Sequence, residues 1–147
     1  DHGAFLVEDD WAHDFGIDAT SRPVVAADDS GQVIYLRSLT KSVSPSMRVA
    51  AVVARGPAHD RILADRGAES MYVSGLLQAA ALDVVTQPAW QSHLRGLRQQ
   101  LRVRRDLLIE SLATHVPEAH LELVPRGGLH VWVRLPDATN LDRLVRA

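Results

Sequence analysis

The sequence predicts an α/β fold, and three observations along its 147 residues lead to this prediction. Short apolar runs of the kind that form strands dominate the first third of the chain. Apolar residues at helical spacing follow, and the longest such segment begins at Pro88. After Pro117 the pattern returns to strand-like alternation. This order indicates the second part of a larger α/β domain, a connecting helix and the start of a smaller α+β domain. We expect these three parts at residues 1–87, 88–116 and 117–147.

Three short strands are expected before the first helix. The first is the apolar run 4–7, which has the character of a buried strand and ends in the acids Glu8, Asp9 and Asp10. A loop rich in glycine, proline and aspartate follows. The second and third strands are expected at residues 33–36 and 49–54.

Helices are expected at residues 59–69, 74–86 and 88–115, and apolar residues recur at helical spacing in the second and third of these. Pro88 suits the first turn of the longest helix. That helix also carries a stripe of arginines, which we interpret as a solvated face partnered by acids: Arg95, Arg98, Arg102 and Arg105. Two strands are expected at residues 120–124 and 129–135, and a last helix near Asn140.

Composition excludes several classes of protein. The formal net charge of −2 and the pI of about 6.4 do not indicate a nucleic-acid surface in this part of the chain. The absence of cysteine excludes disulfides and thiolate metal sites and fits a reducing compartment. No apolar run approaches the roughly 20 residues that span a bilayer. The first residues lack the features of a signal peptide, so we expect a cytoplasmic protein without a membrane partner.

Lys41 is the only lysine in the chain, although arginine is abundant. A lysine amine can lose its proton and attack a carbonyl to form a Schiff base, which a guanidinium cannot do. Hydroxyl side chains flank Lys41 on both sides, and Arg48 lies seven residues further on. Hydroxyls and a forked guanidinium are suited to binding phosphate oxygens. This pattern indicates covalent chemistry beside an anion site.

A phosphorylated aldehyde with a basic ring nitrogen, pyridoxal phosphate, would use these groups together. Asp9 follows one expected strand and Ser38 follows another, and ligands of open α/β sheets bind beyond such carboxyl ends. Spacing alone leaves other interpretations open. In these, Lys41 is a surface lysine, Asp9 a solvated strand end and Arg48 part of a structural ion pair.

The segments VEDDWAHDF and GQVIYLRSLTKSVSPSMRVAAVVARGP resemble the fold-type-I, aminotransferase-like domain of MocR regulators, a branch of the GntR family. The usual pattern there is an EDDY-type strand end, a strand similar to VIYLGSFSK, and an arginine seven residues past the lysine. The long helix with VRRDLLIESL and the segment GGLHVWVRLP extend the resemblance over essentially the whole chain.

The resemblance implies a role for six residues. Lys41 would form the internal aldimine with pyridoxal phosphate, and Asp9 would pair with the pyridine nitrogen. The residues that would hold the phosphate are Ser38, Thr40 and Arg48. Trp11 falls where the family usually has a tyrosine beside the phenolic oxygen of the ring. Because an indole can donate a hydrogen bond but cannot accept one or ionise as a phenol does, this departure affects catalytic turnover more than cofactor binding.

The resemblance also implies partners and missing parts. An N-terminal winged helix-turn-helix, a phosphate-binding glycine loop and an aromatic that stacks on the ring would precede Asp1, and an arginine for a substrate carboxylate would follow Ala147. We expect a homodimer that binds DNA through that N-terminal domain and responds to a small amino compound. The alternative is a true aminotransferase, in which Lys41 also moves protons.

Two other classes of enzyme fit the sequence less well. Ser38-Leu39-Thr40-Lys41 matches the S-x-x-K motif of serine β-lactamases and penicillin-binding proteins, but those enzymes also need a lysine in a K-T-G strand, and this chain has none. The histidines show no H-E-x-x-H or other metal-ligand spacing. We therefore expect no metal, and we interpret the acids around His13 as a capped, solvated loop.

Overall fold

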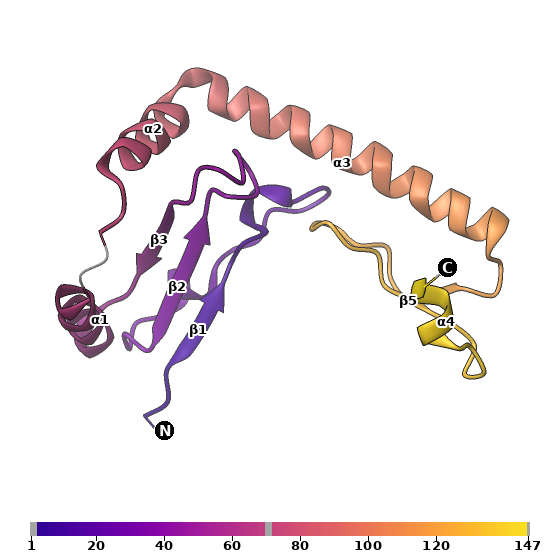
Figure 1. Cartoon of the computed structure of the whole chain (residues 1–147), viewed down its shortest axis with the longest axis horizontal. Coiled ribbons are helices and arrows are strands. Elements are labelled where there is room, and N and C mark those ends of the chain that lie inside the picture. Colours follow the sequence, from indigo (N-terminus) through magenta and orange to yellow (C-terminus); the bar gives the residue numbers. More distant parts are fainter. Residues whose placement is uncertain (1–2, 70–71, 147) are drawn as a thin grey trace.

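A three-stranded sheet, a long helix and a two-stranded ladder follow one another along the chain (Figure 1). The computed structural model describes residues 3–69 and 72–146. The strands are β1 (Leu6–Asp9), β2 (Val33–Ser38), β3 (Ala50–Val53), β4 (His120–Leu121) and β5 (Val133–Arg134). The helices are α1 (Gly56–Ala68), α2 (Gly75–Thr86), α3 (Pro88–His115) and α4 (Leu141–Arg146), and two 3-10 turns lie at His13–Phe15 and Val24–Ala27.

The three-stranded sheet has the order β1-β2-β3. β1 pairs with β2 in parallel, so that Leu6 lies opposite Val33 and Asp9 opposite Leu36. β3 pairs antiparallel with β2, with Ser38 opposite Ala50. The carboxyl ends of β1 and β2 and the amino end of β3 therefore lie at one edge of the sheet. This shared edge positions the candidate site.

β2 is the central strand, and it begins at a turn that Asp28 stabilises. The Asp28 carboxylate accepts hydrogen bonds from the Val33 backbone N–H at 2.9 Å and from the Ser30 hydroxyl at 2.7 Å. The bond from Val33, followed by that from Ser30, lowers the pKa of Asp28 to about 2. Within β2 the alternate residues Val33 and Tyr35 are buried, as the two-residue period of a strand requires.

The hydrophobic core lies between β2, the turn after β1 and the first half of α3. Its largest members are Phe15, Tyr35, Trp90 and Leu94, each at most 8% exposed. Burial of such a side chain stabilises a fold by roughly 1.5–3 kcal/mol. Beyond Leu94 the apolar residues of α3 are less covered, and Leu107 is 64% exposed. The long helix thus packs firmly at its amino end.

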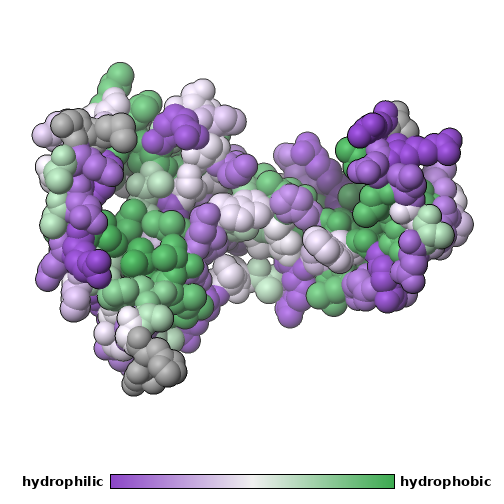
Figure 2. Space-filling model, turned by 60° about the horizontal axis from the view of Figure 1, so that its bottom comes forward, coloured by the Kyte–Doolittle hydropathy of each residue, from purple (hydrophilic) through white to green (hydrophobic). Residues whose placement is uncertain are grey.

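The expectation of a buried first strand is wrong for the described chain. Leu6 and Val7 of β1 are 50% and 58% exposed, and Val52 of β3 is 51% exposed. The β1 side chains stay uncovered because α1 and α2 lie at the opposite, β3 side of the sheet (Figure 1), and Val52 is exposed even on that side. Figure 2 shows a wide apolar area on the larger of the two lobes.

The helices begin and end close to their expected positions. Pro57 and Pro88 lie in the first turns of α1 and α3, where their missing N–H groups have no partner to lose. Ser74 caps α2 by accepting a hydrogen bond from the Leu77 N–H at 3.5 Å. Over residues 3–69 and 72–146, none of the helices combines the length and apolar character that crossing a bilayer requires.

The strands expected after Pro117 are much shorter than their alternation suggested. In the part of this region that the structure describes, only His120–Leu121 and Val133–Arg134 form a ladder. Between them, the backbone of 126–128 pairs with the turn after β1 instead: the Ile17 and Asp18 N–H groups donate to the Arg126 carbonyl at 2.9 Å. The Gly128 N–H donates to the Phe15 carbonyl at 2.9 Å. These bonds tie the segment between the two expected strands to the turn after β1.

Candidate functional site

Five of the six expected site residues lie at or just beyond one edge of the sheet. Asp9 ends β1 and Ser38 ends the parallel strand β2. A further backbone bond, from the Leu39 N–H to the Val49 carbonyl at 3.1 Å, extends the β2–β3 pairing by one step. The loop 40–48, which contains Thr40, Lys41 and Arg48, therefore projects beyond the strand end that neighbours Asp9. The topology brings together residues that are far apart in the sequence.

The three consecutive acids at the end of β1 have different surroundings. Glu8 accepts hydrogen bonds from the Val24 and Val25 N–H groups, at 3.1 and 3.3 Å. Asp10 binds Tyr35 and His13. Asp9 is exposed, and within residues 3–69 and 72–146 its carboxylate has no hydrogen-bond or ion-pair partner. Alternate residues of a strand point to opposite faces, so two acids stabilise the fold and the one between them remains available to a ligand.

A polar cluster at the end of β1 consists of Asp10, His13 and Tyr35. Asp10 Oδ2 accepts from the Tyr35 hydroxyl at 2.9 Å and lies 2.8 Å from His13 Nδ1. Burial, followed by the hydrogen bond to the Asp10 carboxylate, raises the pKa of Tyr35 to about 12. The Tyr35 phenol is therefore neutral over the ordinary pH range and acts as a donor that fixes the carboxylate.

The loop 40–48 is ordered by local hydrogen bonds while Lys41 itself is exposed. The Ser38 hydroxyl oxygen accepts from the Thr40 N–H at 3.1 Å, and the Val43 N–H donates to the Leu39 carbonyl at 3.0 Å. The Ser38 hydroxyl hydrogen remains free to donate to an anion. The turn thus directs hydroxyl and backbone donors to the same region as the Lys41 amine.

Arg48 adopts a left-handed backbone conformation, with φ of 42° immediately before β3. A non-glycine residue in this region costs about 1–2 kcal/mol. Arg48 is exposed, and among the described residues its guanidinium has no hydrogen-bond or ion-pair partner. Strained backbone of this kind concentrates at ligand sites, where the surrounding structure compensates for it.

The chemistry of this edge fits pyridoxal phosphate. The amine of Lys41, the carboxylate of Asp9 and the guanidinium of Arg48 have no partner among residues 3–69 and 72–146. They supply a nucleophile, an anion for a protonated ring nitrogen and a cation for a phosphate. All three charged groups are thus accessible at the same sheet edge.

Trp11 has a different setting from the other five candidates. It follows β1 in a turn, is half-buried, and packs against Phe15 with ring centroids 6.3 Å apart. Its indole also meets His130 edge to face at 5.8 Å. Trp11 therefore connects the end of β1 with the segment between β4 and β5.

Two long-range contacts near the site have no local signal in the sequence. Arg37 donates to the buried Asp14 carboxylate at 2.7 Å. His93 Nε2 lies 3.0 Å from the Ser42 carbonyl, although 51 positions separate the two residues. The sequence indicates only a surface or helix-end histidine at position 93. His93 is exposed, but it also contacts the loop that contains Lys41.

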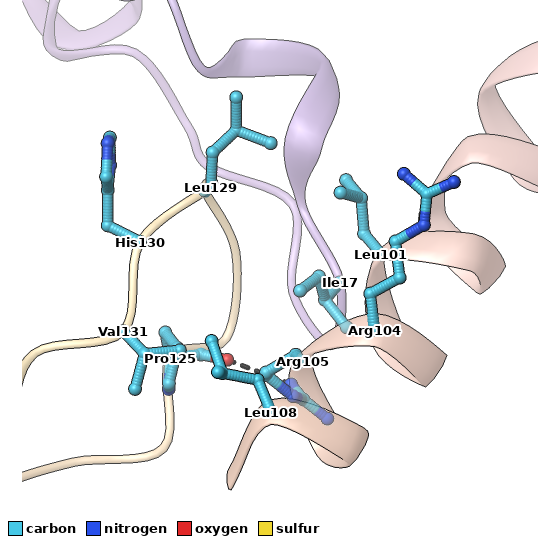
Figure 3. Close-up of a pocket in the computed structure, with 10 residues that line it drawn as sticks. Ile17, Leu101, Arg104, Arg105, Leu108, Pro125, Leu129, His130 and Val131 are labelled. Carbon is cyan, nitrogen blue, oxygen red and sulfur yellow. Dashed lines mark hydrogen bonds between the residues drawn. The ribbon is translucent and has the colours of Figure 1, made fainter. Parts of the chain in front are cut away.

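A second contact region joins the turn after β1, α3 and the segment 125–131. Arg105 donates to the Asp18 carboxylate and to the Pro125 carbonyl, the latter at 2.9 Å (Figure 3). The hydrogen bond from Arg105 lowers the pKa of Asp18. Arg102 also donates to Asp18, at 3.1 Å. Of the four arginines in the stripe on α3, Arg102 and Arg105 therefore have the expected acid partner, Asp18.

This region forms a partly open pocket of about 250 Å³. Its lining is mostly apolar, as Figure 3 shows: Ile17, Leu101, Leu108, Pro125, Leu129 and Val131, with Arg104, Arg105, Gly128 and His130. None of the six residues expected to bind the cofactor contributes to this lining within the described chain.

Comparison with known proteins identifies what the chain resembles. The family described as aminotransferase class I and II matches residues 1–145. The chain is 35% identical over 141 residues to YdfD of Bacillus subtilis, an HTH-type transcriptional regulator, and the match covers 95% of this chain and 29% of YdfD. It is 31% identical over 123 residues to the probable rhizopine catabolism regulatory protein MocR of Rhizobium meliloti, a match that covers 80% of this chain and 24% of MocR.

Solved structures agree with these matches. LysN from Thermus thermophilus, an α-aminoadipate aminotransferase complexed with N-(5'-phosphopyridoxyl)-L-leucine, superposes with a TM-score of 0.84 at 25% identity, over 98% of this chain and 38% of LysN. Pyrococcus horikoshii kynurenine aminotransferase shares the fold with a TM-score of 0.86 at 24% identity, over 97% of this chain and 35% of that protein. The expected fold class and the expected resemblance to MocR-type regulators are confirmed.

Proposed function

This chain belongs to the aminotransferase class I and II family, and we propose that it is the pyridoxal-phosphate-binding, aminotransferase-like effector part of a MocR-type transcriptional regulator. The observation that carries the proposal is that Asp9 ends β1 while Lys41 and Arg48 lie in the loop beyond the neighbouring strand end, with their charged groups unpaired within the described ranges 3–69 and 72–146.

Each site residue has a defined task in this proposal. Pyridoxal phosphate, when bound, supplies an aldehyde carbon and an electron-accepting ring. Lys41 provides the amine that attaches to that carbon. Asp9 keeps a proton on the ring nitrogen, because a carboxylate stabilises the charged form of a nearby base. The donors that bind the phosphate are Ser38, Thr40 and Arg48.

Trp11 limits the chemistry that we propose. An indole N–H beside the cofactor's phenolic oxygen donates one hydrogen bond and cannot ionise. This favours retention of the cofactor over rapid turnover, which suits a sensor. Trp11 also contacts His130, so a shift of Trp11 when a ligand binds would displace the segment 125–131.

The chain spans 29% of YdfD and 24% of MocR. The regulatory role that we propose therefore concerns the complete protein and not this chain alone. We propose that the complete protein is a homodimer that binds DNA through a separate N-terminal domain and acts in the cytoplasm. A small amino compound that reacts at the cofactor would be its effector. Within this chain we propose that residues 1–87 belong to the cofactor-binding domain, 88–116 to a connecting helix and 117–147 to a smaller domain.

Cofactor attachment is the direct test. The full-length protein is mixed with pyridoxal phosphate, its visible absorption is recorded, and borohydride is added to make the attachment permanent. We expect peptide mapping to find the cofactor on Lys41, and the Lys41→Ala variant to lose both the absorption and the labelled peptide. Labelling of another lysine in the parent protein would contradict the assignment.

The second candidate function is a true aminotransferase, which the likeness to LysN favours. The two functions differ in what an amino compound changes. For a regulator, DNA affinity should change when the amine is added to the cofactor-loaded protein, with little release of oxo acid. For an aminotransferase, repeated turnover to the oxo acid should occur whether or not DNA is present.

A further inference from the structure

His93 reaches from the first turns of α3 to the loop that contains Lys41. Its Nε2 lies 3.0 Å from the backbone carbonyl oxygen of Ser42. Because a carbonyl oxygen only accepts hydrogen bonds, Nε2 must carry the proton and donate. The contact therefore fixes the peptide that follows Ser42, one residue beyond the proposed nucleophile.

Trp90 supports His93 from the adjacent turn of α3. The two rings are stacked, with centroids 5.4 Å apart and an interplanar angle of 25°. Trp90 is only 8% exposed, so its ring is fixed by packing. This stack restricts the rotation of the histidine, which reduces the entropy that is lost when the hydrogen bond forms.

Trp90 lies beside both ends of the loop, and His93 lies beside Val43 within it. Trp90 lines a hollow of about 310 Å³ together with Leu39 and Val49, which flank the loop in the sequence. Trp90 and His93 line a second hollow, of about 240 Å³, with Val43. Ser42 is 6% exposed while Lys41 next to it is exposed. The buried side of the turn thus faces α3 and the opposite side presents the amine.

From this geometry we infer that His93, stacked on Trp90, is a positioning residue for Lys41, so that the amino end of α3 sets the conformation of the cofactor loop. This inference rests on the proposed function, since it concerns the residue to which pyridoxal phosphate would attach. It adds a mechanical link: a displacement of α3 would be transmitted to Lys41 through the Ser42 carbonyl.

The test uses three variants of the full-length protein. His93→Phe keeps a ring that can stack on Trp90 and removes the donor. His93→Gln restores an N–H donor of similar reach. His115→Phe is the matched control, because His115 lies on the same helix and its one hydrogen bond in the described chain is with the Ser111 carbonyl, at 3.0 Å.

Two readouts are measured for each variant. The first is backbone amide hydrogen exchange of residues 39–48 in the cofactor-free protein, and the second is the affinity for pyridoxal phosphate. One neutral hydrogen bond corresponds to about a threefold to tenfold change in an equilibrium. We expect His93→Phe to accelerate exchange and weaken cofactor binding by about that factor, His93→Gln to stay near the parent, and His115→Phe to match it.

Each contrary result has one meaning. If His93→Phe exchanges in 39–48 at the parent rate, the inference is wrong. If exchange accelerates while cofactor affinity is unchanged, His93 only stabilises the fold and the positioning role is wrong. A parent protein that takes up no pyridoxal phosphate would instead contradict the proposed function, and the exchange measurement would still decide whether His93 holds the loop.

Discussion

Arg48 shows how a single residue combines an unfavourable backbone with an available charge. Its φ of 42° places it in the left-handed region, and its guanidinium is unpaired among residues 3–69 and 72–146. An arginine kept only for fold stability would be expected to have an acid partner, as Arg37 has in Asp14. The strain is therefore best explained by the direction that the loop must take to present Arg48 at the sheet edge.

Replacement of Arg48 by alanine should weaken binding of pyridoxal phosphate by about 2–3 kcal/mol, because a charge-assisted hydrogen bond to the phosphate is lost. Arg61→Ala is the matched control, since Arg61 is an exposed arginine on α1, outside the loop. Affinities are measured by titrating the cofactor into the full-length protein. Equal affinities for the two variants would exclude Arg48 as a phosphate ligand.

At the scale of elements, short backbone contacts decide where the strands end. Gly16 and Gly127 form an isolated antiparallel bridge between the turn after β1 and the segment preceding β5. A Cβ atom at position 127 would lie 3.0 Å from the Phe15 carbonyl oxygen and 3.2 Å from the Gly16 Cα. Both neighbours are backbone atoms, so neither can move without shifting its segment.

Gly127→Ala should therefore destabilise the protein by about 1–3 kcal/mol, as overpacking does in other tightly packed sites. Gly96→Ala is an informative comparison, because Gly96 lies within α3 and, apart from the neighbouring backbone of its own helix, nothing in the described chain lies within 4 Å of its Cβ position. That substitution should stabilise the protein by about 0.5–1 kcal/mol. Both values are obtained from denaturant unfolding. If Gly127→Ala unfolds at the parent midpoint, the close approach of the two segments is incorrect.

At the scale of the whole molecule, two regions hold α3 to the rest of the described chain. The amino end packs through Trp90 and Leu94. Near the middle, Arg102 and Arg105 bind Asp18, and Arg105 also binds the Pro125 carbonyl. Figure 1 shows α3 extending from the sheet to the β4–β5 ladder, so these contacts determine how the two ends of the molecule are related.

We expect Asp18 to make the free energy of unfolding sensitive to acid. Because Arg105 lowers its pKa in the folded state, the folded protein binds fewer protons at this group than the unfolded chain does. The stability that Asp18 contributes is fully present above its ordinary pKa of 3.8 and is lost as the pH falls through the lower folded-state value.

This prediction is checked by denaturant unfolding of the parent and of the Asp18→Asn variant. The measurements run from about pH 7 to about pH 2, a range that brackets the ordinary carboxyl pKa. The variant should be less stable near neutrality, and the difference should shrink toward the acid end. Asp29→Asn is the control, because Asp29 is an exposed loop residue whose side chain has no partner in the described part of the chain. A difference that grows toward low pH would contradict the role of Asp18.

The sequence by itself indicated the class of fold and the strands and helices of the first two thirds, and its resemblance to a known family pointed to six candidate residues, among them Lys41. Strand and helix periods are local properties, and the lysine-arginine spacing lies within a single loop, so both can be recognised without a three-dimensional structure. The residue-level assignments at this site, from Asp9 to Arg48, remain predictions that the experiments above test.

Only the tertiary structure decided which of the three acids at the end of β1 is unpaired in the described chain, how briefly β4 and β5 pair, and that His93 contacts the Ser42 carbonyl. Arg105 and Asp18 are 87 positions apart, and His93 and Ser42 are 51 apart. No local pattern encodes partners at such separations, because they depend on how packed elements cross in space. The physical reason is that periodicity specifies which face of an element is apolar, while packing alone specifies what that face meets.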